Sequence, residues 1–167
     1  MPARKLIQFL EDNQTPYTTI HHSPTHTATD AAHSAHLKAA QLAKTVVLNA
    51  DNRLLMMVLP ANLRVDLPSL KSAVGAAKLE LPSEQEFTAL FPSCEPGALP
   101  PFGNLYGMDV YCAEQLADED QLIFSAGSHS ELILMKFHDY RRLVNPTLIA
   151  SGTVPPRMHE DKHLDRL

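Results

Sequence analysis

The loop from Gly97 to Gly103, with the sequence GALPPFG, is the first stretch of this chain that could do chemistry. Pro100 and Pro101 each hold φ at about −65° and lack an N–H, whereas Gly97 and Gly103 permit a positive φ and carry no Cβ. Such a loop is stiff and bare, so it would hold small polar atoms of a ligand through main-chain groups. A simple Pro/Gly turn between two strands is the ordinary alternative.

Two ionisable side chains stand where they could serve the same ligand. Lys44 lies at the start of an apolar strand, where its ammonium must either reach water or meet an anion. His129 lies in a turn of small residues that could present its ring to a ligand. A solvated strand-end lysine and an exposed turn histidine are the alternative interpretations, and the residues alone leave both open.

Metal and cofactor chemistry are not indicated. The chain has nine histidines, but they form no HExxH motif and no Cys/His spacing typical of a metal site. His22 and His26 would share a helical face, but Pro24 lies between them. No nucleophile elbow, phosphate-binding loop or catalytic triad is present either, so we expect no cofactor.

Composition limits the class of protein. The 167 residues predict one domain, and 44% hydrophobic with 20% charged residues is ordinary for a globular chain. The sequence contains no apolar run of about 18 residues, so it predicts no membrane span. The apolar stretch near the N-terminus is short and is soon followed by acidic residues, which is not typical of a signal peptide. With two cysteines outside any CxxC motif, we expect a cytoplasmic protein. The net charge of −5 argues against a protein that binds long stretches of nucleic-acid backbone, including DNA, through charge alone.

Helices and strands that would position these residues can be read along the chain. Helical spacing or capping signals predict helices at residues 3–13, from 27 or 29 to about 40, 66–75, 83–92 and 137–143. Apolar and β-branched runs predict strands at 17–21, a hairpin over 44–59, and strands at 78–81, 105–112, 121–125 and 131–136. Helices early and antiparallel strands late indicate an α+β fold.

Four motifs in order resemble the YbaK-type aminoacyl-tRNA deacylases, a family that includes the editing domain inserted in bacterial prolyl-tRNA synthetases. They are AKTVVL at 43–48, VDL leading into LKSAVGAAKLE at 65–80, G-x-x-x-P-x-G at 97–103, and SAG at 125–127 followed by a strand. The likeness covers residues 1 to 145, nearly the whole chain. It implies a mixed, mostly antiparallel barrel-like sheet surrounded by helices.

The resemblance also implies an activity, which is hydrolysis of the ester bond joining a wrong amino acid to the 3′ adenosine of a tRNA. The family's lysine falls on Lys44, its loop on Gly97 to Pro101, and its small-residue turn on Gly127, Ser128 and His129. In the family the loop's main chain orients the ribose and the ester, the terminal 2′-hydroxyl helps to activate water, and no metal is used. A synthetase is a further possible partner.

The resemblance thus assigns catalysis to Lys44, Gly97, Pro101 and His129. It assigns substrate contacts to the rest of the loop, the small-residue turn and two apolar strand residues, namely Ala98, Leu99, Pro100, Gly103, Gly127, Ser128, Val46 and Met57. The amino acid that is removed is left open, because a methylene changes discrimination by only about 1 to 3 kcal/mol.

The chain departs from the family pattern in two places. Ala113 stands where some members have Asp, and residues 146–167 extend past the usual end, so we expect a single editing domain over 1–145 followed by a loosely packed extension. A non-catalytic module of the same fold, binding an aminoacyl or nucleotide ligand, is the alternative function. A histidine-based metal protein is a third and weaker one.

Overall fold

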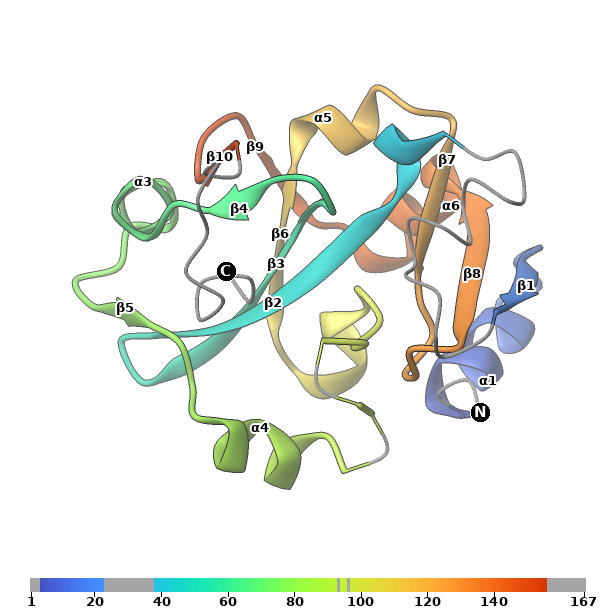
Figure 1. Cartoon of the computed structure of the whole chain (residues 1–167), viewed down its shortest axis with the longest axis horizontal. Helices are drawn as coiled ribbons and strands as arrows, with labels where there is room; N and C mark the ends of the chain where they lie inside the picture. Colours follow the sequence, from blue (N-terminus) through green and yellow to red (C-terminus); the bar gives the residue numbers. More distant parts are fainter. Residues whose placement is uncertain (1–3, 23–37, 93, 96, 156–167) are drawn as a thin grey trace.

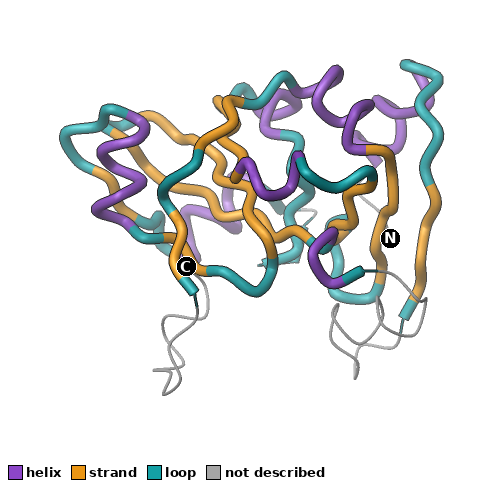
Figure 2. The backbone as a smooth tube through the Cα atoms, turned by 90° about the horizontal axis from the view of Figure 1, so that it is seen from above, coloured by secondary structure: helices purple, strands orange, loops and turns teal. Residues whose placement is uncertain are grey.

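The computed structural model describes residues 4–22, 38–92, 94–95 and 97–155, arranged as two larger sheets side by side and a small two-stranded sheet, with helices around them (Figure 1). The α+β class that the sequence predicted is confirmed. Helices α3 and α1 lie toward opposite ends of the long axis, with most of the strands between them (Figures 1 and 2).

The larger sheet has five strands in the order β5-β2-β3-β6-β9. The predicted hairpin forms its centre, with β2 (Ala43–Ala50) antiparallel to β3 (Arg53–Pro60). Asp51 and Asn52 make the turn at φ values of +51° and +69°, as a tight two-residue hairpin requires. Strand β5 (Leu79–Glu80) pairs antiparallel with β2, whereas β6 (Asp109–Ala113) and β9 (Thr147–Ile149) add in parallel.

The smaller sheet has three antiparallel strands in the order β1-β8-β7. They are β1 (Thr18–His21), β8 (Glu131–Lys136) and β7 (Gln121–Ser125), all close to their predicted bounds. A further two-stranded sheet pairs β4 (Arg64–Val65) with β10 (Thr153–Val154). The sheets are mixed and mostly antiparallel as predicted, but they do not close into a barrel, since a single bridge between Leu42 and Ile123 links the two larger ones.

Four of the predicted helices are present in the described residues. They are α1 (Arg4–Asp12), α3 (Leu67–Val74), α4 (Glu84–Leu90) and α6 (Phe137–Val144). Shorter helical turns occur at η1 (Ala39–Gln41), η2 (Gly103–Tyr106) and α5 (Glu114–Ala117). The helix predicted from 27 or 29 to 40 falls mostly on residues outside those described.

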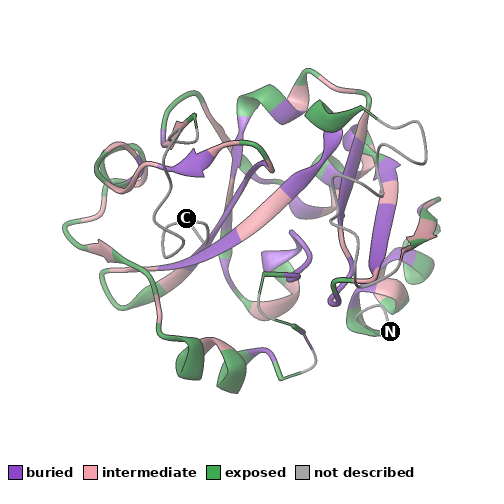
Figure 3. Ribbon diagram, viewed as in Figure 1, coloured by how far each residue is buried: buried purple, intermediate pink, exposed green. Residues whose placement is uncertain are grey.

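Both faces of the central hairpin are buried, which explains its nearly unbroken apolar sequence. Because strand residues alternate between faces, Val47, Met56 and Val58 join the main core while Val46 and Met57 join a second core. The main core also holds the inner faces of α1 and α6. Burial follows the strands and the inner helix faces, whereas α4 is largely exposed (Figure 3).

Two predicted boundaries differ from the structure. Residues 105–108 are not strand, because the chain turns through η2 and an αL residue at Gly107 before β6 begins at Asp109. The extension expected from residue 146 includes β9 and β10, which pair with β6 and β4, so residues 147–154 pack onto the fold. Residues 156–167 lie outside the described part of the chain.

Candidate functional site

A cleft of about 320 Å³ opens between the start of β2, helix α4 and the loop that begins at Gly97. This volume falls in the range of small-molecule sites. Residues 44–47 of β2, Leu81 and Pro82, the first turn of α4 with Phe87, and Gly97 line it. Two of the residues predicted to be catalytic, Lys44 and Gly97, therefore border one cavity although 53 positions separate them in the chain.

Strand β2 walls the cleft because one of its edges is unpaired there. It pairs with β3 along its full length, but with β5 only at Asn49 and Ala50. No other described strand pairs with the remainder of that edge. The cleft thus borders exposed main chain as well as side chains.

The register of the hairpin decides which main-chain groups face the cleft. In an antiparallel pair, successive residues direct their N–H and C=O groups alternately toward and away from the partner strand. Ala50 and Arg53 flank the two-residue turn and face each other, and Asn49 faces the opposite way, toward Glu80 of β5. The same alternation directs the N–H and C=O of Thr45 and Val47 away from β3, toward the cleft.

Helix α4 is held at the cleft by its N-terminal cap. The Ser83 hydroxyl accepts a hydrogen bond from the N–H of Glu86 at 3.1 Å, and the Glu86 carboxylate accepts one from the N–H of Ser83 at 3.0 Å. This is the capping box that the sequence predicted. Phe87, one turn into the helix, lines the cleft and packs on Phe91 at 5.0 Å between ring centroids.

The Gly97 loop is rigid because buried groups hold it from behind. The Tyr140 hydroxyl donates to the carbonyl of Pro101 at 2.8 Å, and the N–H of Phe102 donates to the carbonyl of Pro100 at 2.8 Å. The Phe102 ring is fully buried against Phe9, Phe124 and Tyr140. Burial of Tyr140, and the neighbouring Cys112, raise the pKa of its phenol well above the usual value, so it stays a hydrogen-bond donor.

The front of the loop is bonded to the predicted small-residue turn. The N–H of Glu95 donates to the carbonyl of Gly127, and the N–H of Gly127 donates to the carbonyl of Ala98, each at 2.9 Å. Gly97 lies between these bonds at a φ of +83°, exposed to the cleft. The loop and the turn therefore form one unit.

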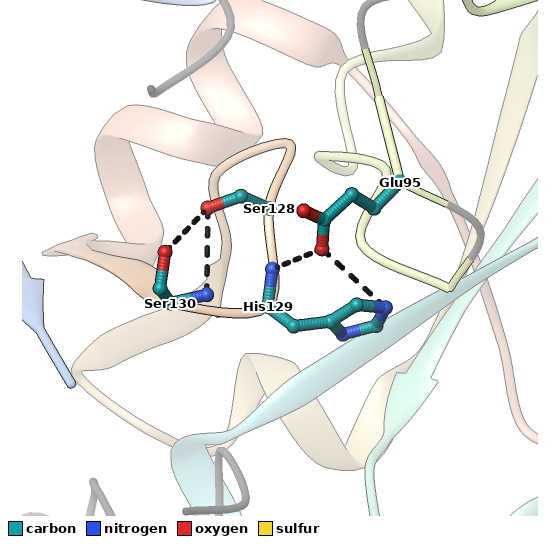
Figure 4. A network of polar contacts seen from close by, with 4 residues as sticks. All are labelled: Glu95, Ser128, His129 and Ser130. Atoms are coloured by element: carbon teal, nitrogen blue, oxygen red, sulfur yellow. Dashed lines mark hydrogen bonds and ion pairs between the residues drawn. The ribbon is translucent and has the colours of Figure 1, made fainter. Parts of the chain in front are cut away.

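His129 lies beside Gly97. A Cβ at position 97 would be 3.5 Å from the Cε1 atom of the histidine. The N–H of His129 donates to the Glu95 carboxylate at 2.9 Å, and Ser128 and Ser130 hydrogen-bond to each other in the same turn (Figure 4). His129 thus borders the rim next to the cleft rather than its wall.

Several residues predicted to be catalytic or to bind substrate are buried instead of lining the cleft. Ala98, Leu99, Pro100 and Pro101 are buried, and Met57 is fully buried in the second core opposite Val46. Gly103 is also buried, and a Cβ there would lie only 2.7 Å from Val110, so close packing explains this glycine. The buried loop residues hold the loop in place, Met57 packs in the second core, and Val46 is both buried and part of the cleft wall.

Sequence reasoning missed the outer wall of the cleft and the carboxylate beside it. The wall comes from Thr45, Val47, Leu81, Pro82, Ser83, Glu84 and Phe87, and the carboxylate is that of Glu95. The capping box located the start of α4, but nothing local indicated that α4 lies over the edge of β2. The position of Glu95, two residues before the loop glycine, was the one local signal that could have identified this carboxylate.

In the described part of the chain, no three His, Cys, Asp or Glu side chains come together as a metal-binding group. No helix there is both long and apolar enough to cross a bilayer.

Comparison with known proteins connects this geometry to a family. Residues 22–143 match the family model described as "Aminoacyl-tRNA editing domain". The multifunctional Ser/Thr-tRNA deacylase ProXp-y of Escherichia coli (strain K12) is 29% identical over 102 residues, and so is its counterpart in Escherichia coli O157:H7. Each match spans 60% of this chain and 60% of the length of the relative.

Solved structures share the fold. A protein described as a candidate trans-editing enzyme for prolyl tRNA synthetase superposes with a TM-score of 0.77 at 19% identity, covering 89% of this chain and 95% of the other. A candidate signal transduction protein from Marinobacter aquaeolei VT8 superposes with a TM-score of 0.72 at 18% identity, covering 92% of this chain but 31% of the other. The same fold thus occurs alone and within a longer chain.

Proposed function

The chain belongs to the aminoacyl-tRNA editing domain family, and from this premise we propose that it is a trans-editing hydrolase. It would cleave the ester between a wrong amino acid and the 3′ adenosine of a tRNA, and release the free amino acid and the tRNA. The observation that carries the proposal is the cleft shared by Lys44 and Gly97, at which a cation and a bare, rigid main chain meet.

The reaction needs charge stabilisation more than it needs a strong nucleophile. Water adds to the ester carbonyl carbon, the carbonyl oxygen becomes an oxyanion, and the bond to the ribose oxygen then breaks as that oxygen takes a proton. Positioned donors near the oxyanion are commonly the largest catalytic contribution in such reactions. The main-chain N–H groups of Gly97 and of the outward-facing edge of β2 are main-chain donors that border the cleft.

The cation of Lys44 suits the anionic part of the substrate. The terminal adenosine carries a phosphate on its 5′ side, and an ammonium at the cleft would neutralise it and fix the nucleotide. Lys44 is half-buried on β2, with Val46 and Thr45 beside it, so its position is constrained by the strand. In this proposal its role is to place the ester rather than to transfer a proton.

The proton of the attacking water goes to the substrate itself. Among the residues lining the cleft, Glu84 carries the single carboxylate, and it is exposed on the first turn of α4. We assign activation of the water to the terminal 2′-hydroxyl of the tRNA and leave Glu84 as a wall residue. Replacement of Glu84 by Gln and of the 2′-hydroxyl by hydrogen separates these two assignments.

We propose a small, hydroxylated amino acid as the substrate of the cleft. Val46, Val47 and Phe87 give it apolar surface, while the Thr45 and Ser83 side chains add hydroxyl groups. The curated relative acts on Ser- and Thr-tRNA by its name, which agrees in size and polarity. We therefore propose seryl or threonyl esters as the substrates, with a tRNA that a synthetase has charged wrongly.

Single-turnover deacylation tests the proposal. The purified chain is mixed with tRNAs that carry Ser, Thr, Ala or Pro, and release of the amino acid is timed. We expect hydrolysis of Ser or Thr esters, little change in Glu84→Gln, and loss of the reaction with a terminal 2′-deoxyadenosine. Failure to deacylate any substrate, combined with tight binding of the same tRNAs, would instead favour the non-catalytic binding module.

A synthetase partner is proposed separately. The net charge of −5 gives the chain little electrostatic affinity for tRNA backbone, so selection of the tRNA body would come from a synthetase that hands over the mischarged product. If this is right, adding the synthetase lowers the KM for mischarged tRNA without changing kcat. An unchanged KM would leave tRNA selection to this chain.

A further inference from the structure

Glu95 is the charged residue nearest the Gly97 loop that neither the sequence motifs nor the cleft wall accounts for. It lies two residues before Gly97, and its side chain is about half exposed at 55%. Its carboxylate points across to the turn that carries His129 (Figure 4). The two segments are 34 positions apart in the chain, so this contact is purely tertiary.

The contact is a hydrogen bond to the main chain rather than an ion pair. Glu95 Oε2 lies 2.9 Å from the N–H of His129, well within hydrogen-bond distance. The same oxygen is 3.9 Å from His129 Nε2, and both side chains are more than half exposed. An exposed pair at that separation contributes little, whereas a carboxylate accepting a main-chain N–H is among the stronger hydrogen bonds.

Three hydrogen bonds between described residues join the loop and the turn. Two are main chain to main chain, from Glu95 N–H to Gly127 C=O and from Gly127 N–H to Ala98 C=O. These two bonds do not involve the side chain at position 95. The third, between the Glu95 carboxylate and the His129 N–H, depends on the side chain, and it holds the end of the turn that lies over Gly97.

We propose that Glu95 is a positioning residue for the cleft: its carboxylate holds the His129 main chain and thereby fixes the distance between the His129 turn and Gly97. This inference rests on the proposed deacylase function. Without that bond the described main-chain bonds at Gly127 remain, but the end of the turn that carries His129 loses its hydrogen bond to Glu95, so the His129 ring shifts relative to Gly97. This shift changes how the ester is held, and it removes no group that touches the tRNA body.

The variants Glu95→Ala and Glu95→Gln test the inference. Glu95→Ala removes the acceptor. We expect the kcat for deacylation to fall by about tenfold and the KM for tRNA to stay unchanged. Glu95→Gln keeps an acceptor oxygen without the charge, so we expect it to stay within about threefold of the unmodified chain. If Gln is as impaired as Ala, charge rather than the hydrogen bond matters and the inference is overturned.

Asp51→Gly is the matched control. Asp51 also uses an exposed carboxylate to accept main-chain N–H groups, those of Ala77 at 3.0 Å and Lys78 at 2.8 Å, and its φ of +51° suits glycine. It does not line the cleft. We expect Asp51→Gly to lower the melting temperature while kcat stays unchanged, and an equal loss of kcat would reduce the role of Glu95 to general stability.

Amide hydrogen exchange separates this inference from the proposed function. The N–H of His129 should exchange faster in Glu95→Ala and stay protected in Glu95→Gln, whatever reaction the protein catalyses. If the unmodified chain deacylates nothing, the proposed function fails even where the exchange pattern is as expected. If it deacylates and Glu95→Ala neither exchanges faster nor loses kcat, the positioning role alone is wrong.

Discussion

At the scale of single residues, Lys44 makes the most direct prediction. Lys44→Ala removes the cation at the cleft but leaves β2 paired with β3 along its length, so deacylation should fall strongly while the cooperative thermal transition is kept. Lys71→Ala, on the exposed face of α3, is the matched control and should leave deacylation unchanged. Loss of the cooperative transition in Lys44→Ala would leave its assignment to substrate unsupported.

Gly97 and His129 form the second pair of residues to compare. A Cβ at Gly97 has space, with its nearest neighbour at 3.5 Å, but the φ of +83° is strained for alanine and the methyl group would point toward His129. We expect Gly97→Ala to lower the single-turnover rate by about a hundredfold to a thousandfold, as loss of oxyanion donors does. The melting temperature should change only slightly.

His129→Ala should cost less than Gly97→Ala, because the main-chain bond from position 129 to Glu95 remains. The opposite order, with His129→Ala inactive and Gly97→Ala unaffected, would show that the imidazole acts as a general base. The substrate-assisted mechanism would then have to be abandoned.

At the scale of secondary-structure elements, α4 is a wall of the cleft held mainly by its ends. None of its residues is buried, so the capping box and the packing of Phe87 on Phe91 keep it in place. Glu86→Ala breaks half of the box without removing a residue that lines the cleft. We expect faster amide exchange in the first turn of α4 and a loss of deacylation of about threefold, since one solvent-exposed hydrogen bond is lost.

Glu86→Gln is the conservative control for this element. A glutamine at this position can still accept the N–H of Ser83, so both exchange and deacylation should stay near those of the unmodified chain. Should Glu86→Ala change exchange but not deacylation, α4 would be a cover for the cleft with no part in holding the substrate.

At the scale of the whole molecule, the buried core makes a prediction about alkaline stability. Burial raises the pKa of Cys112 from its ordinary 9.0 to about 12, so the folded state keeps this proton longer than the unfolded chain does. The resulting stability is present in full below the unfolded pKa and is lost as pH rises toward the folded one. The free energy of unfolding should therefore fall as pH increases through this window.

Denaturant unfolding from about pH 8 to about pH 11 measures this slope. Cys112→Ala should show a shallower decline because the titrating thiol is gone. Leu116→Ala, equally buried in the same core, should be less stable at every pH but keep the original slope. Equal slopes in all three proteins would mean that the thiol does not titrate in this window.

The sequence alone determined the local structure and the family. Apolar runs, the Asp51-Asn52 turn, the capping box at Ser83 and the glycine after α3 predicted elements that the structure contains, because each is written in neighbouring residues. The same holds for the four ordered motifs, which indicated an aminoacyl-tRNA editing domain before any geometry was known. Lys44, Val46 and Gly97 belong to these motifs, which is why the sequence could predict these three cleft residues.

Only the tertiary structure decided which residues of each motif line the cleft and which pack in the core. Burial of both faces of the hairpin placed Met57 in the core, and close packing against Val110 made Gly103 a structural glycine. The unpaired edge of β2, the position of α4 beside it and the bond from Glu95 to His129 join segments that are distant in the chain. Such contacts depend on how sheets and loops pack together, and no local pattern encodes them.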